Sequence, residues 1–166
     1  MRISQQPDGF MDNTALPHIR KAALGDAGQI GRLAAELGYP ATNQDIASRL
    51  EALLRLPSHF VAVAEDESAL VGWVAVEERL LLVSGKKAEL MGLIVAPAAR
   101  RHGIGKMLVQ AAECWALEQG FDAIMVRSNV ARPESHSFYE DIGYTRNKTQ
   151  HAYFKRLSSD PGSASA

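Results

Sequence analysis

The amino-acid sequence predicts a mixed α/β domain built around one sheet. Apolar stripes at helical spacing alternate along the chain with short runs rich in Val, Ile and Ala, which are typical of strands. The chain has 166 residues, of which 46% are hydrophobic and 22% are charged. This length and this composition suit one globular domain with a substantial core.

The first elements are a short strand and two helices. Residues 18–22 form the expected strand, and Asp26 is the expected N-cap of a helix that Gly38 ends. Thr42 and Asp45 have the spacing of a capping box, which predicts the start of a second helix.

A hairpin and a further strand occupy the middle of the chain. Residues 59–65 and 70–76 are β-rich and flank an acidic turn at 66–68, which predicts an antiparallel pair. Residues 88–95 form another apolar run, closed by Pro97.

The last part alternates again between helix and strand. Apolar residues line one side of a helix from Ile104 to Gly120, and residues 122–128 predict a strand. Pro133 suits the first turn of a short helix, and residues 144–157 predict one or two closing strands.

The two ends of the chain differ from its middle. Residues 1–16 and 158–166 are polar or small, so we expect flexible tails there. Residues 17–157 contain no repeat or linker-like stretch and are expected to form a single domain.

Composition argues against several function classes. Eighteen basic and 19 acidic residues give a net charge of −1, which offers no general reason for nucleic-acid or membrane binding. Cys114 is the single cysteine, so we expect no internal disulfide, and no motif has metal-ligand spacing. With no signal peptide or membrane span in the pattern, the expected location is the cytoplasm.

The chemistry is predicted in the turn between the strand at 88–95 and the following helix, which reads Arg100-Arg101-His102-Gly103-Ile104-Gly105. A helix N-terminus offers unpaired N–H groups and the positive end of its dipole, which suit a pyrophosphate. The two glycines let the backbone approach a ligand, and Lys106 adds charge. The dinucleotide and P-loop patterns both fail here.

Arg100-x-x-Gly103-x-Gly105 resembles the acetyl-CoA signature of the GNAT superfamily of N-acetyltransferases, Gln/Arg-x-x-Gly-x-Gly/Ala. Residues 138–144 are similar to that family's Tyr-x-x-x-Gly-Phe/Tyr segment. The resemblance covers nearly all of residues 18–157. It implies a GNAT-like fold, with a central, mostly antiparallel sheet, a splayed parallel strand pair and about four flanking helices.

The resemblance also implies acetyl-CoA as co-substrate and a set of contacts to it. Its pantetheine arm would pair with the strand at 93–95 like an added strand, and N–H groups of 101–106 would hold the pyrophosphate. The predicted cofactor-binding residues are Leu93, Ile94, Val95, Arg100, Arg101, His102, Gly103, Ile104, Gly105, Lys106, Asn129 and His136. Asn129 is alternatively a turn residue, since it lies ten positions before Tyr139 where family members have seven. His136 alternatively only starts a helix.

Two residues are predicted to be catalytic. By the motif match, Tyr139 is the general acid that protonates the leaving CoA thiolate. Glu89 is the predicted general base, acting on the amine through a water, or alternatively a strand-end carboxylate paired with Lys87. Cys114 is expected to be an inert helical residue.

The predicted reaction is direct attack of a primary amine of a small molecule on acetyl-CoA in a ternary complex. Alternative acceptors are a peptide N-terminus or a protein lysine, and an alternative function is a CoA-binding regulatory domain without turnover. The acceptor site is expected around residues 38–40, 80–87 and the last strands. The family resemblance makes a homodimer an expectation as well.

Overall fold

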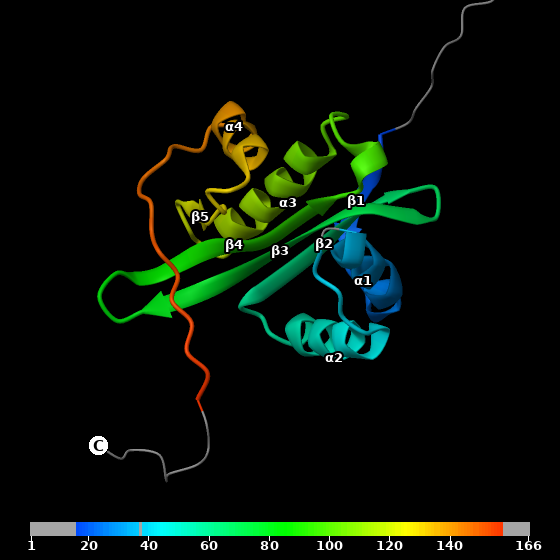
Figure 1. The fold of residues 1–166 in the computed structure, drawn as a ribbon, viewed down its shortest axis with the longest axis horizontal. Helices are drawn as coiled ribbons and strands as arrows, with labels where there is room; N and C mark the ends of the chain where they lie inside the picture. The colour runs from blue at the N-terminus through cyan, green and yellow to red at the C-terminus, as the bar shows by residue number, and fades with distance from the viewer. Residues whose placement is uncertain (1–15, 37, 158–166) are drawn as a thin grey trace, which may run out of the picture. The chain divides into compact units, whose positions relative to one another are not determined.

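The computed structural model describes residues 16–36 and 38–157. The predicted tails therefore lie outside the described residues, except for Leu16. The chain divides into two compact units, Met1–Arg127 and Ser128–Ala166. Figure 1 shows the order of their helices and strands.

The first unit is built on a five-stranded sheet in the order β1-β2-β3-β4-β5. Neighbouring strands are antiparallel, apart from β4 and β5, which are parallel. The strands are β1 (His18–Lys21), β2 (His59–Asp66), β3 (Ala69–Leu81), β4 (Gly85–Val95) and β5 (Ile124–Val126). This topology confirms the predicted mixed, mostly antiparallel sheet with one parallel pair.

Helices cover both faces of the sheet in this unit (Figure 1). On one face lie α1 (Ala27–Glu36) and α2 (Asn43–Leu54), and on the other lies α3 (Ile104–Glu118). Two short 3-10 turns, η1 (Leu24–Asp26) and η2 (Pro97–Ala99), precede α1 and α3. The fourth helix, α4 (Pro133–Asp141), belongs to the second unit.

The core has two layers because strand side chains alternate between the faces. Toward α1 and α2, Val61 and Val63 pack with apolar residues of those helices. Toward α3, Val74 and Val76 are fully buried, as is Leu108 of α3. Residues of the predicted apolar helix stripes, such as Leu33 and Leu108, and of the predicted strands, such as Val63 and Val74, are therefore buried.

The predicted capping box of α2 is confirmed. The hydroxyl of Thr42 accepts from the Asp45 N–H at 3.0 Å, and the Asp45 carboxylate accepts from the Thr42 N–H at 3.3 Å. The prediction that Asp26 caps a helix directly is wrong in detail. Asp26 ends η1, its carboxylate accepts from the Ala23 N–H at 2.8 Å, and α1 starts at the next residue.

Two other predictions differ from the structure. The expected connection at 80–87 is mostly strand, because β3 runs to Leu81 and β4 begins at Gly85, and Lys86 pairs across the hairpin with Glu78 at 2.6 Å. The strands expected at 144–157 do not form. Those residues carry no regular structure, and residues 145–157 are all exposed. The polar run at 145–150 gives this segment no apolar face to bury.

Candidate functional site

The pairing of the parallel strands β4 and β5 stops part-way along β4, because β5 is the shorter strand. They pair only at Ala88–Leu90 of β4 and Ile124–Val126 of β5, while β4 continues to Val95. We use the name fork for the place where the pairing of β4 with β5 ends, together with the open edge of β4 at residues 91–95 beyond it.

A bulge lies where the fork begins. Gly92 is opposite Ala75 of β3 and Leu90 is opposite Val76, so Met91 is an extra residue on β4. A bulge bends its strand and increases the local twist, and this one coincides with the end of the pairing between β4 and β5. Gly92 is required there, because a Cβ would lie 2.8 Å from the Trp73 ring.

The fork presents backbone hydrogen-bonding groups on its open edge. The Ala96 N–H donates to the Val71 carbonyl at 2.8 Å, so the groups of Ala96 and, two residues earlier, of Ile94 face β3. The N–H and C=O groups of Leu93 and Val95 therefore face away from β3. This is the side of β4 on which β5 pairs with the earlier residues Ala88–Leu90. The Arg100 side chain donates to the Val95 carbonyl at 3.2 Å, so it covers the end of this edge.

The predicted phosphate turn follows directly. Gly103 has φ 79° at the N-cap of α3, a left-handed conformation that favours glycine, and the Met107 N–H donates to its carbonyl at 3.0 Å. Arg101 also has a positive φ of 65°, which is uncommon for a residue with a side chain. The first helical N–H groups, at 104–106, have no helical acceptor and project from the start of α3. The side chains of Arg100, Arg101, His102 and Lys106 are exposed around them.

Glu89 is a buried carboxylate, only 2% exposed, on β4 next to the fork. Its Oε2 accepts from Arg79 at 2.7 Å, and Arg127 reaches both oxygens, with Nε 3.0 Å from Oε1 and Nη2 3.3 Å from Oε2. The alternative that Glu89 is a strand-end group paired with Lys87 is therefore wrong. Neither arginine belongs to a sequence motif, and only the strand register brings them to Glu89.

Tyr139 lies on α4 in the second unit. Its ring is 5.1 Å from that of Phe138 and 5.5 Å from that of Tyr144, measured between centroids. Burial of the phenol raises the pKa of Tyr139 to about 12. The hydroxyl is therefore protonated at neutral pH, as a proton or hydrogen-bond donor must be.

Asn129 and His136 are brought together in the same unit. The Asn129 side-chain oxygen accepts from the Ala131 N–H at 2.9 Å, which makes it the first residue of an Asx-turn. The His136 Nε2 lies 3.0 Å from the Asn129 carbonyl oxygen. These contacts give both residues a role in the loop before α4, and their predicted contacts to a cofactor stay predictions.

Residues 30–144 match the family model described as Acetyltransferase (GNAT) family. The chain belongs to this family. The resemblance seen in the sequence is thereby confirmed.

Relatives and solved structures agree with the assignment to the GNAT family. Aminoglycoside N(6')-acetyltransferase type 1 of Klebsiella aerogenes is 31% identical over 137 residues, 78% of this chain and 90% of that protein. N-acetyltransferase family 8 member 3 of Mus musculus is 28% identical over 70% of this chain, which spans only 53% of that relative. The fold is similar to that of AAC(6')-Iy in complex with the bisubstrate analog CoA-S-monomethyl-acetylneamine, with a TM-score of 0.77 and 18% identity over 86% of this chain and 100% of that one.

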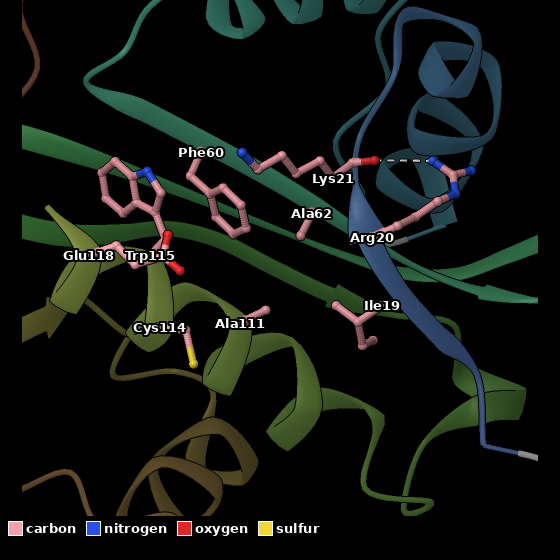
Figure 2. Close-up of a pocket in the computed structure, with 9 residues that line it drawn as sticks. All are labelled: Ile19, Arg20, Lys21, Phe60, Ala62, Ala111, Cys114, Trp115 and Glu118. Carbon is pink, nitrogen blue, oxygen red and sulfur yellow. Dashed lines mark hydrogen bonds between the residues drawn. The ribbon is translucent and has the colours of Figure 1, made fainter.

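A groove of this GNAT chain lies away from the fork, between α3 and the strands β1 and β2 (Figure 2). Phe60 and Trp115 stack there with ring centroids 5.9 Å apart, and Cys114 is exposed at its side. None of the predicted cofactor or catalytic residues lines the groove. Cys114 follows no glycine turn and sits inside α3, as predicted for an inert residue.

The described part of the chain contains neither a metal-binding cluster nor a membrane-spanning helix. Within residues 16–36 and 38–157, no three His, Cys, Asp or Glu side chains gather closely enough to ligate a metal ion. Among the helices of those same residues, none combines the length and apolar character needed to span a bilayer.

Proposed function

We propose that this GNAT chain transfers an acetyl group from acetyl-CoA to a primary amine of a small molecule. The observation that supports this best is the continuous path formed by the fork, the Gly103 turn and the N-terminus of α3. An extended, amide-bearing arm can add to the open β4 edge, while a pyrophosphate meets helix N–H groups at the end of it. CoA combines these two features in one molecule.

The acetyl group would lie near the bulge, just beyond the last pair of β4 with β5. In the proposed reaction the neutral amine attacks the thioester carbonyl, and a backbone N–H near Leu93 stabilises the oxyanion. The C–S bond then breaks, the attacking nitrogen loses one proton to solvent as the amide forms, and Tyr139 donates a hydrogen bond or its proton to the departing thiolate. Substrates bind together, so no acyl-enzyme forms and Cys114 takes no part.

The amine must lose its proton before attack, because an alkyl ammonium has a pKa of about 10. Glu89 as the base for this step stays a prediction from the sequence. The arginine contacts of its carboxylate favour a positioning role.

The 31% identical Klebsiella aerogenes relative, named as an aminoglycoside acetyltransferase, supports a small-molecule acceptor. A cytoplasmic location is a further proposal that rests on the sequence pattern, and a homodimer is one that rests on the family resemblance.

The test is release of free CoA from acetyl-CoA in the presence of a panel of amines. The panel includes aminoglycosides, amino sugars, a peptide with a free N-terminus and a lysine peptide with a blocked one. We expect turnover with a small amine and intersecting initial-rate lines when both substrates are varied. Turnover with the peptides alone would overturn the acceptor class, and CoA binding without any turnover would favour the regulatory alternative.

A Cys114→Ala variant is the control for the mechanism. Direct transfer predicts turnover close to wild type in this variant. Parallel initial-rate lines for the wild-type protein, together with an acetylated Cys114 in it, would contradict direct transfer.

A further inference from the structure

The two guanidiniums on Glu89 come from different parts of the chain and have different surroundings. Arg79 lies on β3 and also contacts Glu77, at 3.4 Å, which itself lies 3.4 Å from His59. Arg127 directly follows β5, its side chain is 57% exposed, and the ion pair described for it is with Glu89. Burial of a carboxylate is costly unless it is paired, so Glu89 and its partners hold each other in place.

Arg127 stands at the mouth of the fork. Leu90 and Val126 are the last paired residues of β4 and β5, and Arg127 is the next residue along β5. Its guanidinium reaches back to both oxygens of Glu89 on β4. A side-chain link thus follows directly where the backbone ladder between these strands ends.

We propose that Glu89 is a positioning residue that clamps Arg127 and thereby fixes the separation of β4 and β5 at the fork. The proposal rests on the proposed function, because the fixed gap is the one that would admit the pantetheine arm. A gap held at the right width before binding spares the ligand the cost of ordering it, so the clamp increases CoA affinity.

The clamp competes with the general-base role for the same carboxylate. A carboxylate has about four lone-pair positions, and arginine donors occupy three of them on Glu89. A base would also gain nothing from Arg127, whereas a clamp fails without it. The two roles therefore predict different effects of removing Arg127: weaker CoA binding for the clamp, and no loss for the base.

The experiment measures the dissociation constant of CoA by calorimetry on the full chain. Under the clamp, Arg127→Met and Glu89→Gln each weaken CoA binding by about fivefold to tenfold, and the double variant is no weaker than either single one. Arg127→Lys falls between, because it keeps the charge and loses the bidentate geometry. Since Arg127 is half exposed, Met at this position leaves the core unchanged, and melting temperatures verify folding.

Arg79→Met is the matched control. It removes the other guanidinium from Glu89 but leaves the link across the fork, so CoA affinity stays within about twofold of wild type. An equal loss in Arg79→Met would show a general effect of the buried charge and would overturn the clamp. Wild-type affinity in Glu89→Gln together with weak binding in Arg127→Met would also overturn it, because Arg127 would then contact CoA itself.

Kinetics separate the clamp from the base. The clamp predicts that Glu89→Gln raises KM for acetyl-CoA while kcat at saturation stays within about threefold and the pH profile keeps its shape. A kcat lowered by about 10²-fold or more, with the acidic limb lost and CoA affinity unchanged, would instead establish the base. If wild-type protein does not bind CoA, the proposed function fails. If wild type binds CoA and both fork variants bind it equally well, only the clamp fails.

Discussion

At the residue scale, Tyr139 shows how its surroundings restrict a role read from a motif. Burial raises its pKa to about 12, well above the ordinary pKa of a thiol, about 8.5. Complete transfer of the Tyr139 proton to a thiolate is therefore thermodynamically unfavourable, on the pKa that Tyr139 has without a bound ligand. Hydrogen-bond donation to the developing thiolate remains favourable, because it strengthens as the negative charge grows.

Replacement of Tyr139 by Phe tests this role. The change keeps the ring that contacts Phe138 and Tyr144, so the fold and CoA affinity should change little. Loss of one donor to a developing anion costs about 10² to 10³ in rate. The measurement is single-turnover acetyl transfer at saturating acetyl-CoA, which removes any masking by slow product release. A rate within about threefold of wild type would return Tyr139 to packing, since a lost donor costs far more.

Gly103 provides a second prediction at this scale. At φ 79° a β-branched residue is strained, and open space surrounds its Cβ position among the described residues, where the proposed pyrophosphate would lie. Gly103→Val should therefore weaken CoA binding by more than about tenfold, with a stability loss of about 1–3 kcal/mol.

Gly103→Asn is the matched control for the strain, because Asn tolerates positive φ better than Val. It should keep near-wild-type stability and still bind CoA less well, since its side chain enters the same space. CoA affinity within about threefold of wild type in both variants would contradict the phosphate turn.

At the element scale, one cluster of charges fastens the first strand to its neighbours. The Arg20 guanidinium donates to both oxygens of Asp26 at 2.8 and 2.9 Å, and to Glu65 on β2 at 2.8 Å. The Arg20 hydrogen bonds lower the pKa of Asp26 below its ordinary value of 3.8. Asp26 also accepts from the Ala23 N–H, so β1, η1 and β2 meet at this carboxylate.

The Asp26→Asn variant should make the contribution of this cluster measurable. The folded pKa of Asp26 is depressed, so its stabilising effect is complete above the unfolded pKa and is lost as pH falls through the folded one. We expect a loss of about 1–3 kcal/mol at pH 7, shrinking below about pH 4 as the wild-type carboxylate becomes protonated. Urea unfolding at several pH values measures it. A difference that stayed constant down to about pH 2 would exclude the ionic contribution.

The elements predicted correctly carry their signal within a few adjacent residues. Thr42 and Asp45 define a cap by spacing alone, and the glycine turn before α3 can be read in the same way. The strands expected at 144–157 were wrong, because short aromatic runs such as Tyr153 and Phe154 predict strand only if a partner and a buried face exist. The length of β3 and β4 was missed since polar cross-strand pairs, such as Glu78 with Lys86, leave no apolar signal.

At the scale of the whole molecule, the glycine turn at the start of α3 could be predicted from the sequence, whereas contacts between distant strands could not. A pyrophosphate needs helix N–H groups and glycine, which one segment of chain supplies. The bulge at Met91 and the pairing of Glu89 with Arg127 depend on the register between strands, and Arg127 lies 38 positions from Glu89. No local pattern encodes such a contact. The acceptor side has no sequence motif. The proposed substrate class therefore depends mainly on the similarity to known acetyltransferases.

Ligand binding by the intact protein provides the last prediction. A ligand that binds only the folded chain stabilises it by about 2.7 kcal/mol when present at 100 times its dissociation constant. For a chain of this length about 1 kcal/mol shifts the melting temperature by about 2–4 °C, so CoA should raise it by about 5–10 °C. Differential scanning calorimetry with increasing CoA measures the shift, which should grow with the logarithm of ligand concentration.

The control for this shift is Gly103→Val at the same CoA concentrations. If the phosphate turn supplies much of the binding energy, the variant should melt at nearly the same temperature with and without CoA. An equal rise in wild type and variant would place CoA elsewhere on the protein, and the groove beside Phe60 and Trp115 would be the next site to test by substitution. A wild-type melting temperature that does not respond to CoA would contradict CoA binding, because specific binding to the folded state must stabilise it.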